Sequence, residues 1–132
     1  MHIDHIGIAV ADLEAAAKTY ESILNSSCTK REVVESEKVE TAFFQTGESK
    51  VELLGATSED SVIAKYVAKK GQGLHHVAFE VEDIYAELDR LRAEGFTILN
   101  EQPKDGADNK LVAFVHPKDN AGVLVELCQS KK

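Results

Sequence analysis

Two histidines and two glutamates occupy matching places in a repeat of this sequence. His5 opens the segment HIGIAVADL, and His76 opens the similar segment HVAFEVEDI 71 residues later. Glu52 and Glu126 each stand at the centre of a Val-Glu-Leu triplet. Two imidazoles and two carboxylates suit a borderline divalent metal in octahedral geometry, with two positions left for water or substrate. Open positions are typical of catalytic metal sites, so His5, Glu52, His76 and Glu126 are predicted to hold a catalytic divalent metal.

The repeat carries this prediction, because each residue alone has a simpler interpretation. A single His on a strand is usually a hydrogen-bonded polar group, and a single Glu in an apolar strand usually faces solvent. The match persists elsewhere, since Ala42-Phe43 falls on Ala113-Phe114 at the same offset of 71 residues. Three additional residues of the second copy fall within the turn-forming segment VHPKDNAGV. The chain is therefore interpreted as a duplicated βαβββ unit, whose symmetry would place equivalent residues around one centre.

The elements that position these residues follow from hydrophobic spacing. Each copy opens with alternating residues, so that Ile6 and Ile8 share one strand face while His5 lies on the other. Asp12 and Asp83 are suitable N-caps for the helices that follow. Weaker strand patterns occur at residues 28–34, 39–45 and 50–54 in the first copy and at 97–100, 111–115 and 123–128 in the second. A linker helix is predicted at 61–69.

Composition limits the fold and the partners. The 132 residues, 43% of them apolar, suit one domain with a modest core. A formal charge of -8 disfavours binding to nucleic acid or anionic lipid. We find no signal-peptide pattern and no apolar stretch long enough to span a membrane. Two isolated cysteines predict free thiols, and the expected location is cytoplasmic.

Four segments resemble the vicinal oxygen chelate superfamily, which includes glyoxalase and bleomycin resistance proteins, and within it the methylmalonyl-CoA epimerase family. They are DHIGIAV from Asp4, GLHHVAFEV from Gly73, HP at His116 and GVLVEL from Gly122. The resemblance implies an α+β fold in which two tandem βαβββ modules form a curved mixed sheet around a central metal-binding cup. It implies one domain over residues 1–132, with module one at about 1–57, the linker helix at about 58–70 and module two at about 71–132.

The resemblance also implies a reaction. Members of that family epimerise (R)- and (S)-methylmalonyl-CoA by removing the α proton and returning it to the opposite face, through an enolate that a metal stabilises. The family's metal ligands map onto His5, Glu52, His76 and Glu126. Its catalytic carboxylate maps onto Glu40 in VETAFF, which can reach a cup if Ala42 and Phe44 line it. Glu126 is the candidate for a second base.

Alternatives remain open at this point. Some epimerases carry Gln at the place of Glu52, and a His, Glu, His, Glu set also resembles lactoylglutathione lyase of the glyoxalase I type. A ligand-sequestering protein without enzymatic activity is a third option on the same fold. The resemblance favours an acyl-CoA substrate, a homodimer, and cobalt, manganese, nickel, zinc or magnesium as the metal. Lys104, Lys110 and Lys118 are predicted to be solvated surface residues rather than contacts for the anionic CoA.

Overall fold

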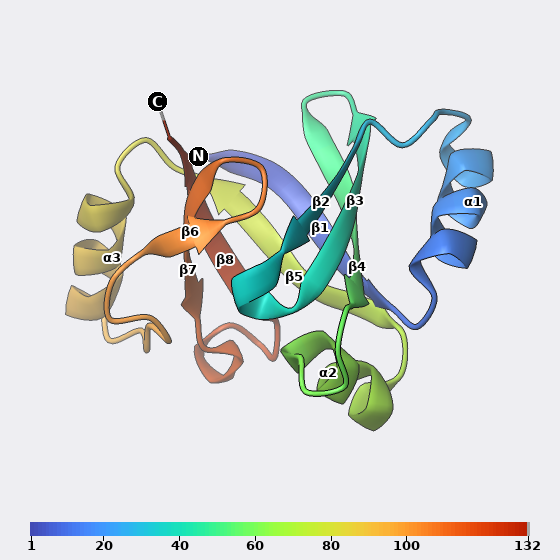
Figure 1. The fold of residues 1–132 in the computed structure, drawn as a ribbon. Helices are drawn as coiled ribbons and strands as arrows, with labels where there is room; N and C mark the ends of the chain where they lie inside the picture. Colours follow the sequence, from blue (N-terminus) through green and yellow to red (C-terminus); the bar gives the residue numbers. More distant parts are fainter. Residues whose placement is uncertain (132) are drawn as a thin grey trace. The chain divides into compact units, whose positions relative to one another are not determined.

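The computed structural model describes residues 1–131, and these form two compact units (Figure 1). Unit 1 combines Met1–His5 with the chain from His76 onward, and unit 2 holds Ile6–His75. The first strand, β1 (His2–Val10), therefore begins in unit 1 and continues into unit 2. This division differs from the boundary between the two sequence modules, and it puts His5 in the same unit as His76.

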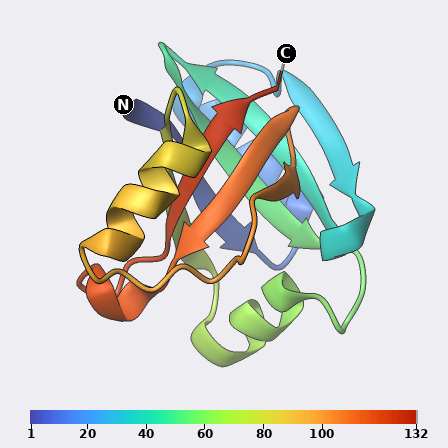
Figure 2. The same cartoon turned by 90° about the vertical axis from the view of Figure 1, so that its left-hand side faces the viewer.

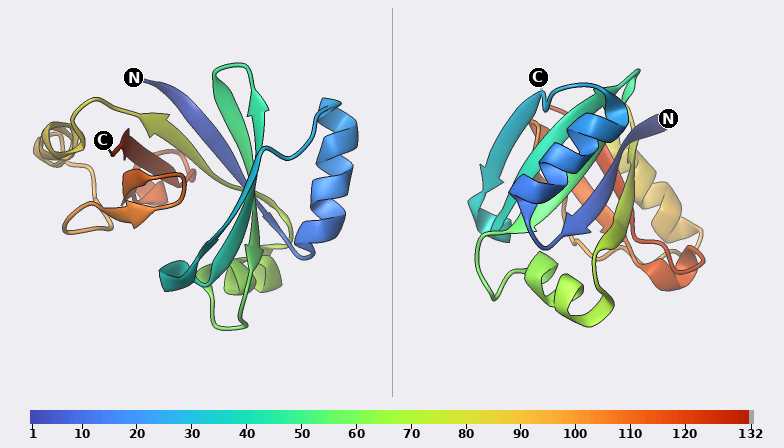
Figure 3. Two further views of the ribbon diagram at one scale, coloured as in Figure 1. Left: turned by 45° about the horizontal axis from the view of Figure 1, so that its top comes forward. Right: turned by 90° about the vertical axis from the view of Figure 1, so that its right-hand side faces the viewer.

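Unit 2 is built from the continuation of β1 and the elements that follow it. These are α1 (Leu13–Leu24), β2 (Lys30–Val34), β3 (Val39–Thr46), β4 (Ser49–Ala56) and α2 (Val62–Lys70). The strand order is β2-β3-β4-β1, and β3 is antiparallel to both of its neighbours, β2 and β4. α1 lies across these strands (Figure 3, right). Their shared core contains Ala17 of α1, Phe44 of β3 and Leu53 of β4.

Unit 1 contains the first residues of β1 and the second module. Its elements are β5 (Gly73–Glu80, entering from unit 2), α3 (Ile84–Ala93), β6 (Lys104–Gly106), β7 (Lys110–Val115) and β8 (Val125–Ser130). The strand order is β1-β5-β8-β7-β6. β5 runs parallel to β8, whereas β7 is antiparallel to both β8 and β6.

The two faces of the unit 1 sheet have different contents. One face is covered by α3 (Figure 2). Ile84 and Leu88 of the helix are buried against Ala113 and Leu127 of the sheet. Since side chains alternate along a strand, the neighbours of these residues point the other way. That opposite face carries a smaller cluster of Ala78, Val112 and Cys128, with Phe114 packed against it. The register continues this face to His76 and Glu126.

The βαβββ order in each half confirms the predicted α+β class, and α2 confirms the linker helix. One strand prediction is wrong. Residues 97–100 form no strand, and only Ile98 makes an isolated bridge, to Val115. The second strand of this module is instead the three-residue β6, because Gly106 and Lys110 close a tight hairpin onto β7. That the chain forms one domain stays a prediction. No helix within residues 1–131 has the length and apolar character needed to cross a membrane.

Both predicted N-caps are confirmed. The Asp83 carboxylate accepts a hydrogen bond of 3.1 Å from the backbone N–H of Ala86, and Asp12 accepts the same bond from Ala15. We expect Asp83→Ala to lower the free energy of unfolding by about 1 kcal/mol, because α3 loses a partner for an otherwise unsatisfied N–H. Chemical denaturation measures this change. Asp89→Ala, at an exposed position of the same helix, is the control, and an equal loss there would contradict a capping effect.

Candidate functional site

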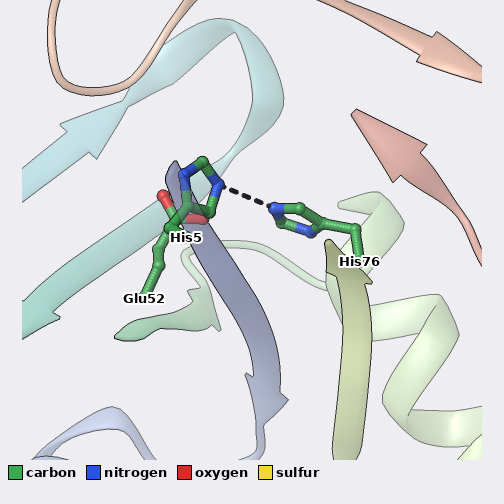
Figure 4. A group of neighbouring side chains, drawn as sticks. All are labelled: His5, Glu52 and His76. Carbon is green, nitrogen blue, oxygen red and sulfur yellow. Dashed lines mark hydrogen bonds between the residues drawn. The ribbon is translucent and has the colours of Figure 1, made fainter. Parts of the chain in front are cut away.

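Three of the four predicted metal ligands meet within unit 1. The Nε2 atoms of His5 and His76 lie 3.1 Å apart (Figure 4). The Oε1 atom of Glu126 lies 3.2 Å from the Nε2 atom of His76 and 3.7 Å from that of His5. Each of the three residues is at most 6% exposed. Two imidazole nitrogens and one carboxylate oxygen, each able to bind a metal through a lone pair, thus lie close together in the protein interior.

Strand pairing explains why these residues meet. In the parallel pairing of β5 and β8, Ala78 is the partner of Glu126, two residues along the strand from His76. In the antiparallel pairing of β7 and β8, Glu126 is opposite Phe114. The Phe114 ring stands edge-on to the His76 imidazole, with the ring centroids 6.3 Å apart. Ala78 is small and fully buried, so no side chain at that position crowds the two histidines.

Asp4 determines which nitrogen of His5 faces the site. The Nδ1 atom of His5 lies 2.7 Å from Oδ2 of Asp4, and an ionised carboxylate only accepts hydrogen bonds. Nδ1 therefore carries the proton, which leaves the Nε2 lone pair directed at His76 and Glu126. A ligating histidine that donates its other N–H to a carboxylate is the usual arrangement at protein metal centres. The donor set and this hydrogen bond both fit a divalent metal.

Glu52 is the fourth predicted ligand, and it lies on β4 of unit 2. Its strand neighbours Val51 and Leu53 both pack into the core beneath α1. Alternation along the strand therefore directs Glu52 to the other face of the unit 2 sheet, where it is 4% exposed. An ionised carboxylate buried to this degree requires a compensating partner. That Glu52 is a metal ligand stays a prediction.

Glu40 has a different environment from the one that its predicted role requires. Ala42 and Phe44, which share its strand face, pack against Ala17 of α1, so the condition under which Glu40 was expected to reach a cup is not met. The Glu40 carboxylate lies 3.2 Å from the Arg31 guanidinium on the neighbouring strand.

That guanidinium connects Glu40 to the helix. Arg31 also binds Glu14 of α1 at 2.6 Å, and this hydrogen bond lowers the pKa of Glu14 and raises that of Arg31. Glu40 is therefore part of a half-exposed ion-pair group on the α1 side of the sheet.

Asp4 and Lys110 are two residues of the site region that the sequence analysis missed. Asp4 directly precedes the predicted ligand His5 in the segment DHIGIAV, and this position is the signal in the sequence that points to it. Lys110 was predicted to be solvated, and this is wrong, whereas Lys104 and Lys118 are exposed as expected. The missed signal is that Lys110 directly precedes the segment LVAFV, which is apolar on both faces of its strand, so that a lysine on the same strand is buried with it.

Comparisons with known proteins identify the family of this chain. A model of the Glyoxalase/Bleomycin resistance protein/Dioxygenase superfamily matches residues 4–114. The mitochondrial methylmalonyl-CoA epimerase of Homo sapiens is 40% identical over 129 residues, which cover 97% of this chain and 73% of that protein. An ethylmalonyl-CoA/methylmalonyl-CoA epimerase of Cereibacter sphaeroides is 42% identical over 129 residues, covering 96% of each chain.

A solved structure extends the likeness to three dimensions. The structure of a variant of Streptomyces coelicolor methylmalonyl-CoA epimerase, in complex with 2-nitronate-propionyl-CoA, matches with a TM-score of 0.93 and 37% identity, and the match covers 100% of this chain and 99% of that one. A probable lactoylglutathione lyase of Vibrio cholerae is less similar, at 27% identity. The chain belongs to the glyoxalase/bleomycin resistance protein/dioxygenase superfamily, and methylmalonyl-CoA epimerases are its relatives over its whole length.

Proposed function

We propose that this protein interconverts the two epimers of methylmalonyl-CoA. The observation that carries the proposal is the buried cluster of His5, His76 and Glu126. The chain that holds this cluster is 40% identical to a named epimerase over nearly its full length. The complex of the Streptomyces relative with 2-nitronate-propionyl-CoA supports an acyl-CoA substrate.

The reaction removes the proton that lies between a thioester carbonyl and a carboxylate and returns it to the other face of the carbon. A divalent metal, when bound, supplies Lewis-acid polarisation of the oxygen on which enolate charge develops. We propose His5, His76 and Glu126 as its ligands, joined by Glu52. The repeat in sequence and the burial of Glu52 support this fourth ligand. The donor set admits cobalt, manganese, nickel, zinc or magnesium.

Glu126 is our candidate for the base that takes the α proton. Its Oε1 atom is directed at the two imidazoles, and a carboxylate has a second oxygen that remains able to accept a proton. Phe114, Ala78 and Val112 make its surroundings on this sheet face apolar. An apolar environment limits competing solvation of a carboxylate base.

Glu40 was the sequence-based candidate for the other base, and it provides a test of the geometry. We expect Glu40→Gln to leave the rate of α-proton exchange unchanged, because the carboxylate pairs with Arg31 on the α1 side of the sheet. Stability should fall by no more than about 1 kcal/mol, as for other exposed ion pairs. Deuterium incorporation measures the rate. A loss of exchange larger than tenfold in a folded Glu40→Gln protein would restore Glu40 as a base.

The proposed function is tested by deuterium wash-in. The metal-free protein is loaded with Co²⁺ and incubated with methylmalonyl-CoA in D₂O, and the α position is followed by ¹H NMR. We expect exchange with the loaded protein and little after chelation. Absence of exchange in the loaded, folded protein would end the proposal, and turnover of the hemithioacetal of methylglyoxal and glutathione instead would make the protein a lactoylglutathione lyase.

Two further properties belong to the same proposal. A homodimer is supported by β2 and β6, which end the strand orders of their units and leave backbone groups that a second copy could cover. Sedimentation velocity tests it. A cytoplasmic location is supported by the free thiols of Cys28 and Cys128, since reducing compartments preserve them.

A further inference from the structure

Lys110 is a buried cation on the same sheet face as the proposed metal site. It is the first residue of β7 and is 7% exposed. The register places it opposite Ser130 of β8, with Val112 opposite Cys128 and Phe114 opposite Glu126 in the next two inward-facing pairs. Lys110 therefore lies at one end of a sheet face whose other end holds His76 and Glu126.

Three strands supply the partners of the Lys110 ammonium. Its Nζ atom lies 2.6 Å from Oε1 of Glu80 on β5, 2.9 Å from Oγ of Ser130 on β8 and 3.5 Å from Oδ1 of Asp4 on β1. The Ser130 hydroxyl donates a further hydrogen bond of 2.7 Å to Glu80. Burial of a lysine is costly unless its charge is paired in this way.

The pair stays charged at neutral pH. Burial on its own lowers the pKa of Lys110, but the hydrogen bond that Lys110 donates to Glu80 and the charges of Asp4 and Glu80 outweigh it, so that the pKa is raised. The hydrogen bond that Glu80 accepts from Lys110, followed by the one that it accepts from Ser130, lowers the pKa of Glu80. The Lys110 ammonium therefore has two anionic neighbours, Glu80 and Asp4, and Asp4 is the one that also contacts the proposed ligand His5.

Asp4 divides its two oxygens between Lys110 and His5. Its Oδ1 atom faces the ammonium at 3.5 Å, while Oδ2 accepts the proton on Nδ1 of His5 at 2.7 Å. The side chain of Asp4 is 5% exposed, which leaves little room for water to replace either partner. Lys110 lies between the carboxylates of Asp4 and Glu80, so its removal would take from Asp4 the ion pair that Oδ1 makes and leave Oδ2 less firmly held beside His5.

We propose that Lys110 is a positioning residue, which holds Asp4 as the hydrogen-bond acceptor for Nδ1 of His5 and so keeps the Nε2 lone pair of His5 directed into the proposed metal site. This inference rests on the proposed function, because His5 is one of the ligands of the metal proposed there. It adds Asp4 and Lys110 to the site as residues that hold a ligand in place. In the metal-free protein His76 is then the donor in the 3.1 Å pair between the two Nε2 atoms.

The first test is the tautomer of His5 in the metal-free, wild-type protein, read by long-range ¹H–¹⁵N NMR correlation. We expect the proton of His5 on Nδ1 and an unprotonated Nε2. A proton on Nε2 of His5 would overturn the proposal without any substitution. This readout is independent of catalysis, so a protein that shows the expected tautomer but exchanges no α proton would contradict the proposed function alone.

The second test is a double-mutant cycle with Co²⁺ affinity as a second readout. We expect Lys110→Met to weaken Co²⁺ binding by about 10- to 100-fold, as loss of outer support for a metal ligand does, and to populate the Nε2–H tautomer of His5. In an Asp4→Ala background the same substitution should change neither quantity further, because its effect passes through Asp4. Lys110→Arg keeps the charge and should restore part of the affinity.

The controls keep the cycle decisive. Lys18→Met removes an exposed lysine of α1 and should change neither readout. Lys110→Gln retains a donor for Glu80 and takes the place of Lys110→Met if thermal unfolding shows that the latter does not fold. Equal losses of affinity with and without Asp4, or an unchanged tautomer and affinity in the folded Lys110 variants, would each overturn the proposal.

Discussion

Replacing Glu126 by Gln is expected to lower the rate of α-proton exchange in methylmalonyl-CoA by about 10²- to 10⁴-fold, the usual effect of losing a general base. The amide keeps the size of the side chain and one oxygen, but it cannot take up a proton at neutral pH. Glu126 is 6% exposed and lies beside both histidines, so a carboxylate on the exposed surface of unit 1 cannot take over its role. The rate is measured by deuterium wash-in.

The metal content of the Glu126→Gln protein shows which of its two proposed roles is lost. If Co²⁺ still binds while exchange disappears, the carboxylate acts as a base. If Co²⁺ is lost as well, its role as a ligand accounts for the defect. Glu82→Gln removes an exposed glutamate of the same unit and should behave as wild type. Exchange at the wild-type rate in the folded Glu126→Gln protein would contradict both roles.

Replacing His76 by Ala is expected to weaken Co²⁺ binding more than about 100-fold, since loss of a direct ligand should exceed the 10- to 100-fold effects of outer-layer substitutions. The Nε2 atom of His76 faces both Nε2 of His5 and Oε1 of Glu126, so its removal leaves two of the three donors that meet in unit 1. Calorimetric titration of the metal-free protein measures the affinity.

The neighbouring residue His75 provides a matched control. It lies in unit 2, where its ring stands edge-on to Tyr66 at 4.8 Å between centroids, as expected for the opposite side of the strand from His76. His75→Ala removes the same type of side chain one position away and should bind Co²⁺ as wild type does. Equal loss in both variants would show that general damage to β5, rather than a missing ligand, weakens the binding.

Patterns visible in the sequence were sufficient to predict where the helices begin and which His and Glu residues correspond in the two copies of the repeat. Asp12 and Asp83 cap helices because a short acidic side chain reaches the free N–H groups of the first turn, an interaction within four residues. The match of His5 with His76 and of the two Val-Glu-Leu triplets was visible because duplication preserves residue types at equivalent places. The prediction of a strand at 97–100 was wrong because the short apolar segment there forms a single isolated bridge, at Ile98, rather than a continuous series of strand pairs.

Sequence by itself thus determined the repeat, the α+β order and the candidate ligands, of which His5, His76 and Glu126 lie together. Only the tertiary structure decided which face of β3 carries Glu40, because alternation defines two faces without saying which of them a helix covers. It also decided the partners of Asp4 and Lys110, which come from strands far apart in the chain. A buried charge is stabilised by whatever lies within a few ångströms in space, and spacing along the sequence does not encode that distance.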